Sequence, residues 1–407
     1  MQPFLQTLIY IMNNQNPKIL IVGAGPSGST LAIFLGKKGI YHDLIDKQIF
    51  PRKKTCGDTL TLEAIAVLSK INQGKTDENL ERIIHNVHAL DVINSKGNYW
   101  RLQVKNKIND GLFWCVERKL FDNYLLQKIN PQYTNFIAQT SCLSLQKKND
   151  KVLAHLKNID GEKTVQYDLV IGADGDRSVV KKYLHFNGNQ KFKAQNFASI
   201  RAYYKGVEGV DSLKFYYFNQ LLPGYFWIFP MQNGVFNVGL AVLNTTIEKN
   251  KLNLKTELEN IIQQNSIVAP HCKHAIKISE IEGWSIPLSS KIEQVYGDNF
   301  LLLGDAAHLA EATTGKGIGI AMLSSEIAAD TIELAIKNND FTAKTLKNYQ
   351  ETLHKRHLST WKFITFAQKC FTYPLIITLF IRFANVSFIN KYIQNYLQKA
   401  YQKYILH

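Results

Sequence analysis

The sequence predicts an α/β protein in which a doubly wound domain is interrupted by an antiparallel β domain and followed by a helical tail. Three observations support this prediction. A short apolar run at 18–22 leads into a glycine-rich turn and a helical pattern, and residues 299–307 repeat that order near the other end of the chain. Between them, alternating aromatic segments within 192–290 are typical of an antiparallel sheet. The doubly wound domain is therefore expected to be discontinuous.

The first strand leads into a nucleotide-binding motif. Three glycines follow the apolar run in the spacing G-x-G-x-x-G. The first glycine permits a tight turn, the second lets the backbone approach a pyrophosphate, and the third lets the helix pack on the strand. A helix over about 26–38 would direct its N-terminal amides at that phosphate. The binding residues predicted here are Gly23, Gly25, Pro26, Ser27 and Gly28.

The second strand, predicted at 40–45, ends in an acid. Asp46 stands where such motifs place the carboxylate that binds a ribose, and the adjacent Lys47 joins the predicted site. Together these features predict a Rossmann-like dinucleotide-binding domain, and the acid favours FAD or NAD over NADP. The alternative is a glycine-rich turn in another kind of α/β domain.

Composition limits the classes of protein to consider. A chain of 407 residues with 45% hydrophobic residues is long enough for two or three domains with packed cores. The five cysteines form no C-x-x-C pair, which indicates a reducing compartment and no disulfide framework or zinc module. We therefore expect a cytoplasmic protein without a metal site, in which His271, Cys272 and His274 form a surface turn.

The net charge of +15 is concentrated in the tail. Residues 341–407 carry ten Lys or Arg against Glu351 as the single acid, interleaved with apolar and aromatic residues. No nucleic-acid motif is present, and the pattern favours peripheral contact of 370–407 with an anionic membrane, on its inner face. The apolar segment Cys370–Ile381 is too short to span a bilayer. Packing of the tail on the protein's own body or on a second subunit is the alternative, and the oligomeric state is left open.

The intervening segments set the expected domain boundaries. The loop at 50–60 is too polar for core, so it is expected to carry function. A helix follows at 61–71, strands alternate over 88–117, and another helix starts at Arg118. Asn233-Gly234 predicts a hairpin inside the β domain. The nucleotide-binding domain is assigned residues 15–90, 91–185 (with a strand insertion) and 293–340, the substrate domain 186–292, and the tail 341–407. Translation is expected to begin at Met12 rather than Met1.

Four motifs in order resemble FAD-dependent enzymes of the p-hydroxybenzoate hydroxylase type. They are the glycine motif at 23–28, R-K-L-F-D at 118–122, G-A-D-G-D-R-S at 172–178 and G-D-A-A-H at 304–308. The resemblance covers residues 18–330 and implies that Arg118 contacts the FAD pyrophosphate region. It also implies FAD contacts for Asp174, Gly175, Gly304, Asp305, Gly315, Gly317 and Ile318.

Within that superfamily the chain is most similar to the geranylgeranyl reductases. The loop F-P-R-K-K-T-C-G-D at 50–58, the strand Y-F-W-I-F-P at 225–230 with Gly239 downstream, and T-G-K-G-I at 314–318 match their motifs. Lys316 replaces the usual glutamate, and Ala312-Thr313 replaces a small-residue and proline run. The resemblance implies that the loop at 50–58, with Cys56 and Gly57, lies beside the flavin, and Arg52 is expected to be a ligand of the nearby nucleotide phosphate. It further implies catalytic roles for Cys56, Asp58, Tyr225 and Trp227, with Tyr225, Trp227 and Phe229 binding the substrate.

The resemblance implies an oxidoreductase in which transiently bound NADPH or NADH reduces FAD, and the reduced FAD then reduces carbon–carbon double bonds. The substrate would be an isoprenoid or another lipophilic molecule in an apolar, aromatic site. An aromatic hydroxylase is the second interpretation, and a halogenase or a non-catalytic flavoprotein scaffold is weaker. Each site residue also has a structural alternative. Tyr225, Trp227 and Phe229 could form one buried strand face, Cys56 could be an inert thiol, and Arg52–Lys54 could be a solvated charge run.

Overall fold

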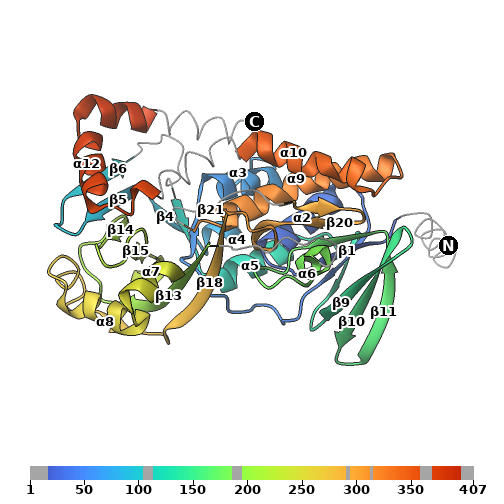
Figure 1. Ribbon diagram of the computed structural model, residues 1–407, viewed down its shortest axis with the longest axis horizontal. Helices are drawn as coiled ribbons and strands as arrows, with labels where there is room; N and C mark the ends of the chain where they lie inside the picture. The colour runs from blue at the N-terminus through green and yellow to red at the C-terminus, as the bar shows by residue number, and fades with distance from the viewer. Residues whose placement is uncertain are drawn as a thin grey trace.

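The computed structural model describes residues 17–103, 113–185, 195–289, 294–311, 315–357 and 369–395. Figure 1 shows an elongated molecule with a mostly parallel sheet at one end, a large mostly antiparallel sheet at the other, and helices between them. The α/β fold class with an inserted β domain and a helical C-terminal region is therefore confirmed. The expected start at Met12 lies outside the described residues.

The parallel sheet organises the nucleotide-binding part. Within the described residues it has six strands in the order β19 (Tyr296–Gly297), β20 (Phe300–Leu302), β12 (Leu169–Gly172), β1 (Ile19–Val22), β2 (His42–Ile45) and β8 (Thr134–Ile137). All neighbours pair in parallel except β19 and β20. The strand β1 is buried along its whole length, as its apolar run predicts for a central parallel strand. The chain thus returns to this sheet after residue 295, and the sheet is discontinuous in sequence.

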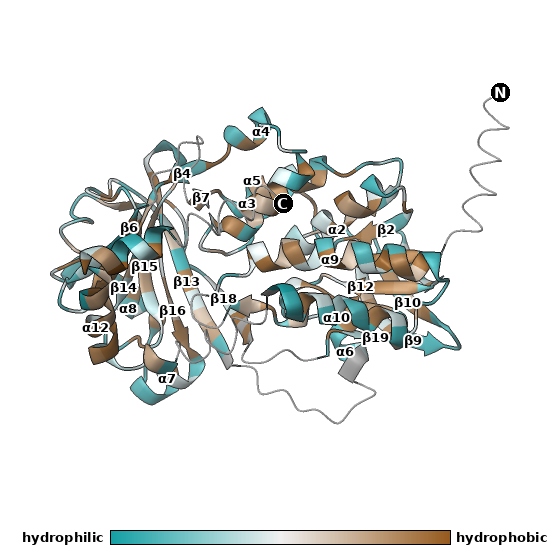
Figure 2. Cartoon of the chain, turned by 90° about the horizontal axis from the view of Figure 1, so that it is seen from above, coloured by the Kyte–Doolittle hydropathy of each residue, from teal (hydrophilic) through white to brown (hydrophobic). Residues whose placement is uncertain are grey.

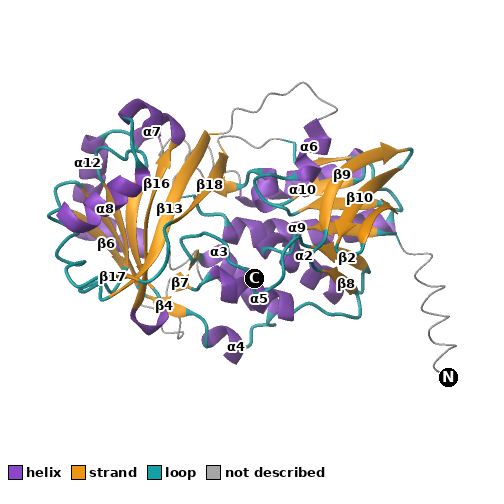
Figure 3. Ribbon diagram, turned by 90° about the horizontal axis from the view of Figure 1, so that it is seen from below, coloured by secondary structure: helices purple, strands orange, loops and turns teal. Residues whose placement is uncertain are grey.

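Helices pack beside this sheet in a layer. The glycine-motif helix α2 (Pro26–Lys37) packs on α9 (Ile318–Lys337), which also contacts α3 (Leu62–Ile71) and α10 (Ala343–His357). Figure 3 shows α2, α3, α5 and α9 between the two large sheets. The remaining helices include a single turn, η2, near the C-terminal end of the parallel sheet. Apart from a 3-10 turn at 232–234 and the tail helices described below, they are α4 (Glu78–Glu81), α5 (Arg118–Gln127), α6 (Val179–His185), α7 (Asn244–Asn250), α8 (Leu254–Gln264) and η2 (Gly304–Ala307).

The large sheet has nine strands among the described residues. Its order is β21 (Ala310–Glu311), β18 (Glu282–Ser289), β13 (Gln195–Lys205), β16 (Val235–Leu243), β15 (Tyr225–Pro230), β14 (Leu213–Tyr217), β5 (Ala89–Asn94) and β6 (Tyr99–Gln103), and β17 (Ile276–Lys277) also pairs with β13. A 3-10 turn with Asn233 and Gly234 at positive φ joins β15 to β16, which confirms the predicted hairpin. The sheet separates two apolar clusters, one of which includes side chains of α8.

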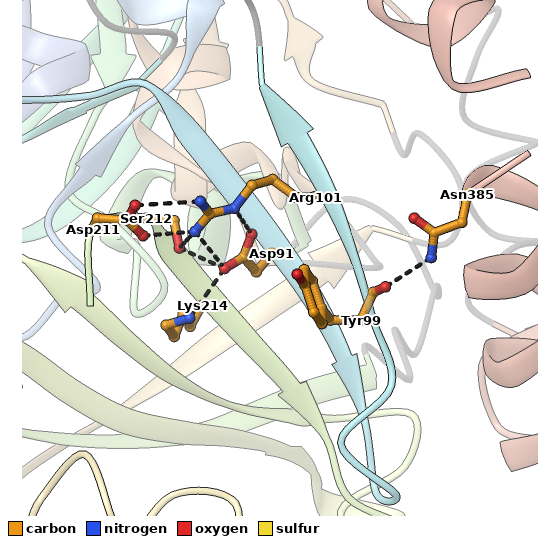
Figure 4. Close-up of polar contacts among 7 residues, drawn as sticks. All are labelled: Asp91, Tyr99, Arg101, Asp211, Ser212, Lys214 and Asn385. Atoms are coloured by element: carbon orange, nitrogen blue, oxygen red, sulfur yellow. Dashed lines mark hydrogen bonds and ion pairs between the residues drawn. The ribbon is translucent and has the colours of Figure 1, made fainter. Parts of the chain in front are cut away.

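Two strands of this sheet come from residues that the predicted boundaries place in the nucleotide-binding domain. β5 pairs in parallel with β14, although 91–185 was assigned to that domain. The buried carboxylate of Asp91 on β5 accepts hydrogen bonds from Arg101 on β6 (2.8 Å), Ser212 (2.7 Å) and Lys214 on β14 (3.1 Å), as Figure 4 shows. Alternation in a sequence predicts strands but not their partners, so the pairing of β5 with β14 could be found only from the structure.

Two smaller sheets and the tail complete the described chain. β3 (Thr59–Leu60), β7 (Phe113–Cys115) and β4 (His85–Val87) form one sheet, and β9 (Ser141–Lys148), β10 (Lys151–Asn158) and β11 (Gly161–Tyr167) form the other. The tail helix α12 (Pro374–Ala384) packs on β5 and β6. In the described part of the chain no single helix has the length and hydropathy of a membrane span. α12 and the helix 387–395, bent by 88°, meet those criteria only as a pair.

Candidate active site

The glycine turn after β1 is shaped for close backbone packing. Gly23 has a φ of +100°, and a Cβ there would lie 2.5 Å from the carbonyl oxygen of Ala173, which follows β12. A Cβ on Gly28 would lie 1.8 Å from the carbonyl oxygen of Gly23. A side chain is excluded at both positions, so the glycine motif packs the start of α2 against the ends of β1 and β12.

A cation lies at the N-terminus of α2. Arg52 Nη2 is 3.3 Å from the position that a Cβ on Gly25, the N-cap residue, would take. The same nitrogen is 3.3 Å from Asp122 Oδ2, and the buried Arg52 Nε has no partner among the described residues. The helix N-terminus and the guanidinium together form a site for an anionic group.

Asp46 is fixed against the same turn. Its Oδ2 accepts a hydrogen bond from the Ala24 amide and its Oδ1 accepts one from the Gln48 amide, both at 2.8 Å. These bonds hold a buried carboxylate at the end of β2, beside the glycine motif. Lys47, which was predicted to join this site, has an exposed side chain.

The second acidic turn follows β12. Asp174 Oδ2 accepts a hydrogen bond from the Val179 amide at 2.7 Å, whereas its buried Oδ1 has no partner within the described chain. Burial raises the pKa of this carboxyl group. Gly175 has a φ of +79° and open space where a Cβ would point. The turn therefore presents a carboxylate oxygen and an unobstructed backbone.

A third turn, which follows β20, lies beside the N-termini of both α2 and α9. Gly304 has a φ of +52°, and a Cβ there would lie 2.3 Å from Ser27 Oγ. A Cβ on Gly317, the N-cap residue of α9, would lie 3.2 Å from Asp305 Oδ1. Burial raises the pKa of Asp305, and the nearby Lys54 opposes that rise. Two more residues predicted to contact FAD lie here: Gly315 has a φ of +68°, and Ile318 is buried at the start of α9.

Lys316, the residue that replaces the usual glutamate, lies between Gly315 and Gly317. Its ammonium is 3.1 Å from Glu311 Oε2, so this lysine has an acidic neighbour on β21.

The loop at 50–58 connects these turns to the large sheet. Arg118, at the start of α5, donates hydrogen bonds to both carboxylate oxygens of Asp122, at 2.7 and 2.9 Å. It also contacts the Cys56 thiol. Burial raises the pKa of this thiol, and the positive charge of Arg118 opposes the rise. The guanidinium expected to contact a pyrophosphate is thus shared between Asp122 and Cys56.

Asp58 lies deeper in the loop. It is fully buried and has a positive φ. Its Oδ2 accepts hydrogen bonds from Tyr203 Oη (2.5 Å) and Asn237 Nδ2 (2.8 Å), and its Oδ1 accepts one from the Arg118 amide (3.3 Å). Burial raises its pKa to about 6, against the lowering effect of these hydrogen bonds. Three donors therefore fix this carboxylate between the loop and the sheet.

The three basic residues of the loop have different surroundings. Lys53 is exposed, whereas the Lys54 ammonium lies 2.9 Å from the ring centroid of Trp284 on β18. Burial lowers the pKa of Lys54 to about 8. Arg52 and Lys54 are thus partly buried beside other site residues, whereas Lys53 is exposed as a solvated charge run would be.

The strand register of the large sheet determines which residues lie side by side near the loop at 50–58. Asn237 on β16 lies between Tyr203 on β13 and Phe229 on β15, and Gly239 lies between Arg201 and Trp227 in the next row. A Cβ on Gly239 would lie 2.4 Å from Trp227 Cζ2, so the glycine leaves room for the indole ring. This contact explains why a glycine follows the Y-x-W-x-F-P segment in the chain.

Asn237 is a site residue that the sequence analysis missed. It is fully buried and uses its side-chain amide completely. Its Oδ1 accepts a hydrogen bond from Trp227 Nε1 at 2.9 Å, and its Nδ2 donates to the Cys56 carbonyl oxygen at 2.9 Å and to Asp58. The available signal was a lone amide inside an apolar strand, because a buried polar side chain requires partners.

The aromatic residues of β15 form a packed row. Neighbouring ring centroids are 5.9 Å apart for Tyr225 and Trp227 and 5.8 Å apart for Trp227 and Phe229. Phe229 lies 3.5 Å from the position that a Cβ on Gly57 would take. All three rings are buried, as the strand-face alternative expects, and the same row lies against the loop. Substrate binding by these residues stays a prediction.

These features fit FAD. A pyrophosphate fits the cradle formed by Gly25, the N-terminus of α2 and the unpartnered Arg52 Nε. The unpartnered Asp174 Oδ1 supplies a further acceptor, and Asp46 stands where the ribose is expected. Within the described residues no group of three or more His, Cys, Asp or Glu side chains is arranged to hold a metal ion.

Comparison with known families agrees with this geometry. The sequence profile of the family described as "FAD binding domain" matches residues 16–366. The chain belongs to this family. It is an FAD-dependent oxidoreductase, and the fold is shared with solved structures. The crystal structure of a geranylgeranyl bacteriochlorophyll reductase-like protein from Thermoplasma acidophilum superposes with a TM-score of 0.80 at 23% identity, over 90% of this chain and 91% of that one.

Curated relatives confirm the resemblance to geranylgeranyl reductases. A digeranylgeranylglycerophospholipid reductase of Methanosphaera stadtmanae is 29% identical over 81% of each chain. The enzyme of that name from Methanocaldococcus jannaschii is 29% identical over 83% of this chain and 82% of its own. A flavin-dependent brominase has a TM-score of 0.71 at 21% identity, over 94% of this chain and all of that one, so it shares the fold alone.

Proposed function

We propose that this oxidoreductase reduces carbon–carbon double bonds of an isoprenoid chain, or of another lipophilic substrate, with NADPH or NADH as the transient donor of electrons to FAD. The observation that carries the proposal is the buried row Tyr225, Trp227 and Phe229 against the loop Cys56–Asp58. Aromatic side chains provide an apolar surface for a prenyl chain and keep water away from it. The relatives named as digeranylgeranylglycerophospholipid reductases support the same substrate class.

The turns after β1, β12 and β20 would hold FAD. Arg52 and the amides of α2 would bind its pyrophosphate, Asp46 its ribose, and Asp305 with the N-terminus of α9 the end nearer the flavin ring. Bound FAD, once reduced, supplies a hydride for one alkene carbon. The aromatic row would orient the prenyl chain so that this carbon meets the flavin.

The other alkene carbon needs a proton, and we assign its donation to the Cys56 thiol. Burial raises the pKa of this thiol, so it carries its proton at neutral pH. When the S–H bond breaks and the new C–H bond forms, the adjacent Arg118 would stabilise the thiolate. After the product has left, the thiolate regains a proton from water that enters the site. Asp58 serves as a positioning residue, because its carboxylate is already bound to Tyr203, Asn237 and the Arg118 amide.

A lipid substrate also implies contact with a membrane. The basic, aromatic tail at 370–407 would bring the protein to an anionic lipid surface.

An anaerobic experiment tests the proposal. The purified protein is reduced, and a glycerophospholipid that carries geranylgeranyl chains is added without oxygen. Flavin reoxidation with a gain of two hydrogens in the lipid is the expected result. If the flavin stays reduced until air enters and an aromatic substrate then gains one oxygen, the protein is a hydroxylase and the proposal is wrong. Halogen incorporation in the presence of bromide or chloride would instead indicate a halogenase.

A further inference from the structure

The tail helix α12 is attached to the large sheet by one face. Ile377, Ile381 and Ala384 are buried against β5 and β6. Asn94 Nδ2 donates a hydrogen bond to Thr378 Oγ1 at 3.1 Å. Asn385 Nδ2 donates one to the Tyr99 carbonyl oxygen at 2.8 Å, as Figure 4 shows. The helix is therefore held in a defined orientation on the protein's own body.

The opposite face of α12 is apolar and exposed. Leu375, Leu379 and Phe383 recur every four residues and are 68%, 40% and 59% exposed. We name these three residues the outer face of α12. Further exposed apolar residues precede and follow the helix: Tyr373, Val386, Phe388 and Tyr392. Several exposed apolar residues along one face of a helix indicate an interaction surface, whereas single exposed apolar residues do not. Figure 2 shows α12 at the opposite end of the molecule from β9 and β10.

Charge identifies the partner of this face. Residues 358–407 contain six Lys or Arg and no Asp or Glu. Lys369, Arg382 and Lys391 lie in the described part of this segment, and the side chains of Arg382 and Lys391 are exposed. Apolar and aromatic residues mixed with basic ones match an anionic lipid surface. A second copy docking here would place like charges opposite one another.

A continuous series of aromatic contacts connects α12 to the candidate active site. The ring centroid of Phe371 is 6.0 Å from that of Phe380 on α12 and 5.5 Å from that of Tyr217 on β14. Tyr217 is in turn 6.0 Å from Tyr225, the first ring of the β15 row. One apolar cluster thus contains both the buried face of α12 and the row that lies against the Cys56–Asp58 loop.

We infer that the outer face of α12 lies on an anionic bilayer, so that a membrane lipid reaches the protein at the end where one apolar cluster joins α12 to the aromatic row against the Cys56–Asp58 loop. The inference rests on the proposed function for the chemistry at the loop. It adds the surface that docks and the end of the molecule from which the substrate enters.

The test uses the full chain with FAD bound. A double variant, Leu375→Asp with Phe383→Asp, places two acids on the outer face. Its matched control, Ile159→Asp with Ile276→Asp, changes two apolar residues that are 84% and 68% exposed elsewhere. Co-sedimentation is measured with vesicles of phosphatidylglycerol and phosphatidylcholine in equal parts, and with phosphatidylcholine alone. Anaerobic flavin reoxidation is measured with the geranylgeranyl lipid either in the anionic vesicles or in detergent micelles.

We expect the native chain and the control to bind the anionic vesicles more tightly than the neutral ones. We expect the outer-face variant to bind them at least about tenfold more weakly. That variant should lose reoxidation with vesicle lipid and keep it with micellar lipid. Equal vesicle binding by variant and control would overturn the inference, as would a dimer that the variant converts to a monomer. Vesicle binding without reoxidation in either presentation would instead contradict the proposed function and leave the docking surface standing.

Discussion

Asp58 shows how burial and hydrogen bonding restrict what a single acid can do. A carboxylate next to Cys56 and Gly57 could be read from the sequence as a catalytic group. In the structure it is fully buried, and Tyr203, Asn237 and the Arg118 amide all donate hydrogen bonds to it. A group with three bound donors stabilises the loop more readily than it exchanges protons with a substrate.

The raised pKa of Asp58 predicts a pH-dependent stability. Its pKa is about 6 in the folded chain, above the usual value of about 3.9 in an unfolded chain. The unfolded chain loses this proton at lower pH than the folded chain does. As pH rises between the two pKa values, the contribution of Asp58 to the free energy of unfolding therefore decreases, by at most about 3 kcal/mol, and it stays constant above pH ~7. Asp58→Asn should remove this decrease. Urea unfolding from pH 4 to 8 measures it, with the exposed Asp160→Asn as control. The same pH dependence in Asp58→Asn would contradict the assignment.

At the scale of elements, the start of α2 combines local sequence with a distant residue. The glycine motif, the helix and Asp46 follow from local spacing, and the structure gives α2 at Pro26–Lys37, as predicted to within a residue. Arg52 is expected from the sequence to bind a nucleotide phosphate, but the sequence does not predict that this side chain, from the loop after β2, covers Gly25. A long, flexible side chain reaches its partner only through the tertiary fold.

Arg52→Ala should weaken FAD binding by about 10- to 100-fold, because it removes charge-assisted hydrogen bonds at the pyrophosphate cradle. Asp122 keeps its two hydrogen bonds from Arg118, so the fold should be retained. The control is Arg82→Ala, which removes an exposed arginine paired with Glu78. Fluorescence titration of the FAD-free protein with FAD gives both dissociation constants. Equal constants for the two variants would rule out Arg52 as a ligand.

For the whole molecule, the sequence predicts the parts better than their assembly. The parallel sheet, the return to it after residue 295 and the Asn233-Gly234 hairpin follow from apolar runs and turn residues, and all three are present. Contacts between distant segments determine that β5 pairs with β14 and that α12 packs on β5 and β6. The hydrophobic periodicity of a segment does not show which distant segment packs against it. Asn237 was missed for the same reason, since its partners Trp227, Cys56 and Asp58 lie on other elements.

Asn237 connects the large sheet to the nucleotide-binding part, so its loss should uncouple substrate from flavin. Asn237→Ala leaves Trp227 Nε1 and the Cys56 carbonyl oxygen without these partners. A shift of about 1 Å in a reacting group can lower a rate about 100-fold. We therefore expect reoxidation by the lipid to slow by about 10- to 100-fold, while reduction by NAD(P)H and FAD affinity change by less than about threefold.

Two comparisons separate positioning from general damage to the fold. Asn196→Ala removes an amide that donates to Ser285 Oγ within the same sheet, at 3.1 Å, and should leave both half-reactions near their native rates. Trp227→Phe removes the indole donor and part of the ring but leaves the hydrogen bonds from Asn237 to the loop, so it should give an intermediate loss in the lipid half-reaction. Stopped-flow flavin absorbance resolves the two half-reactions. If Asn237→Ala slows both by the same factor, or binds FAD as poorly as Arg52→Ala, then Asn237 supports the fold as a whole and does not position the substrate against the loop.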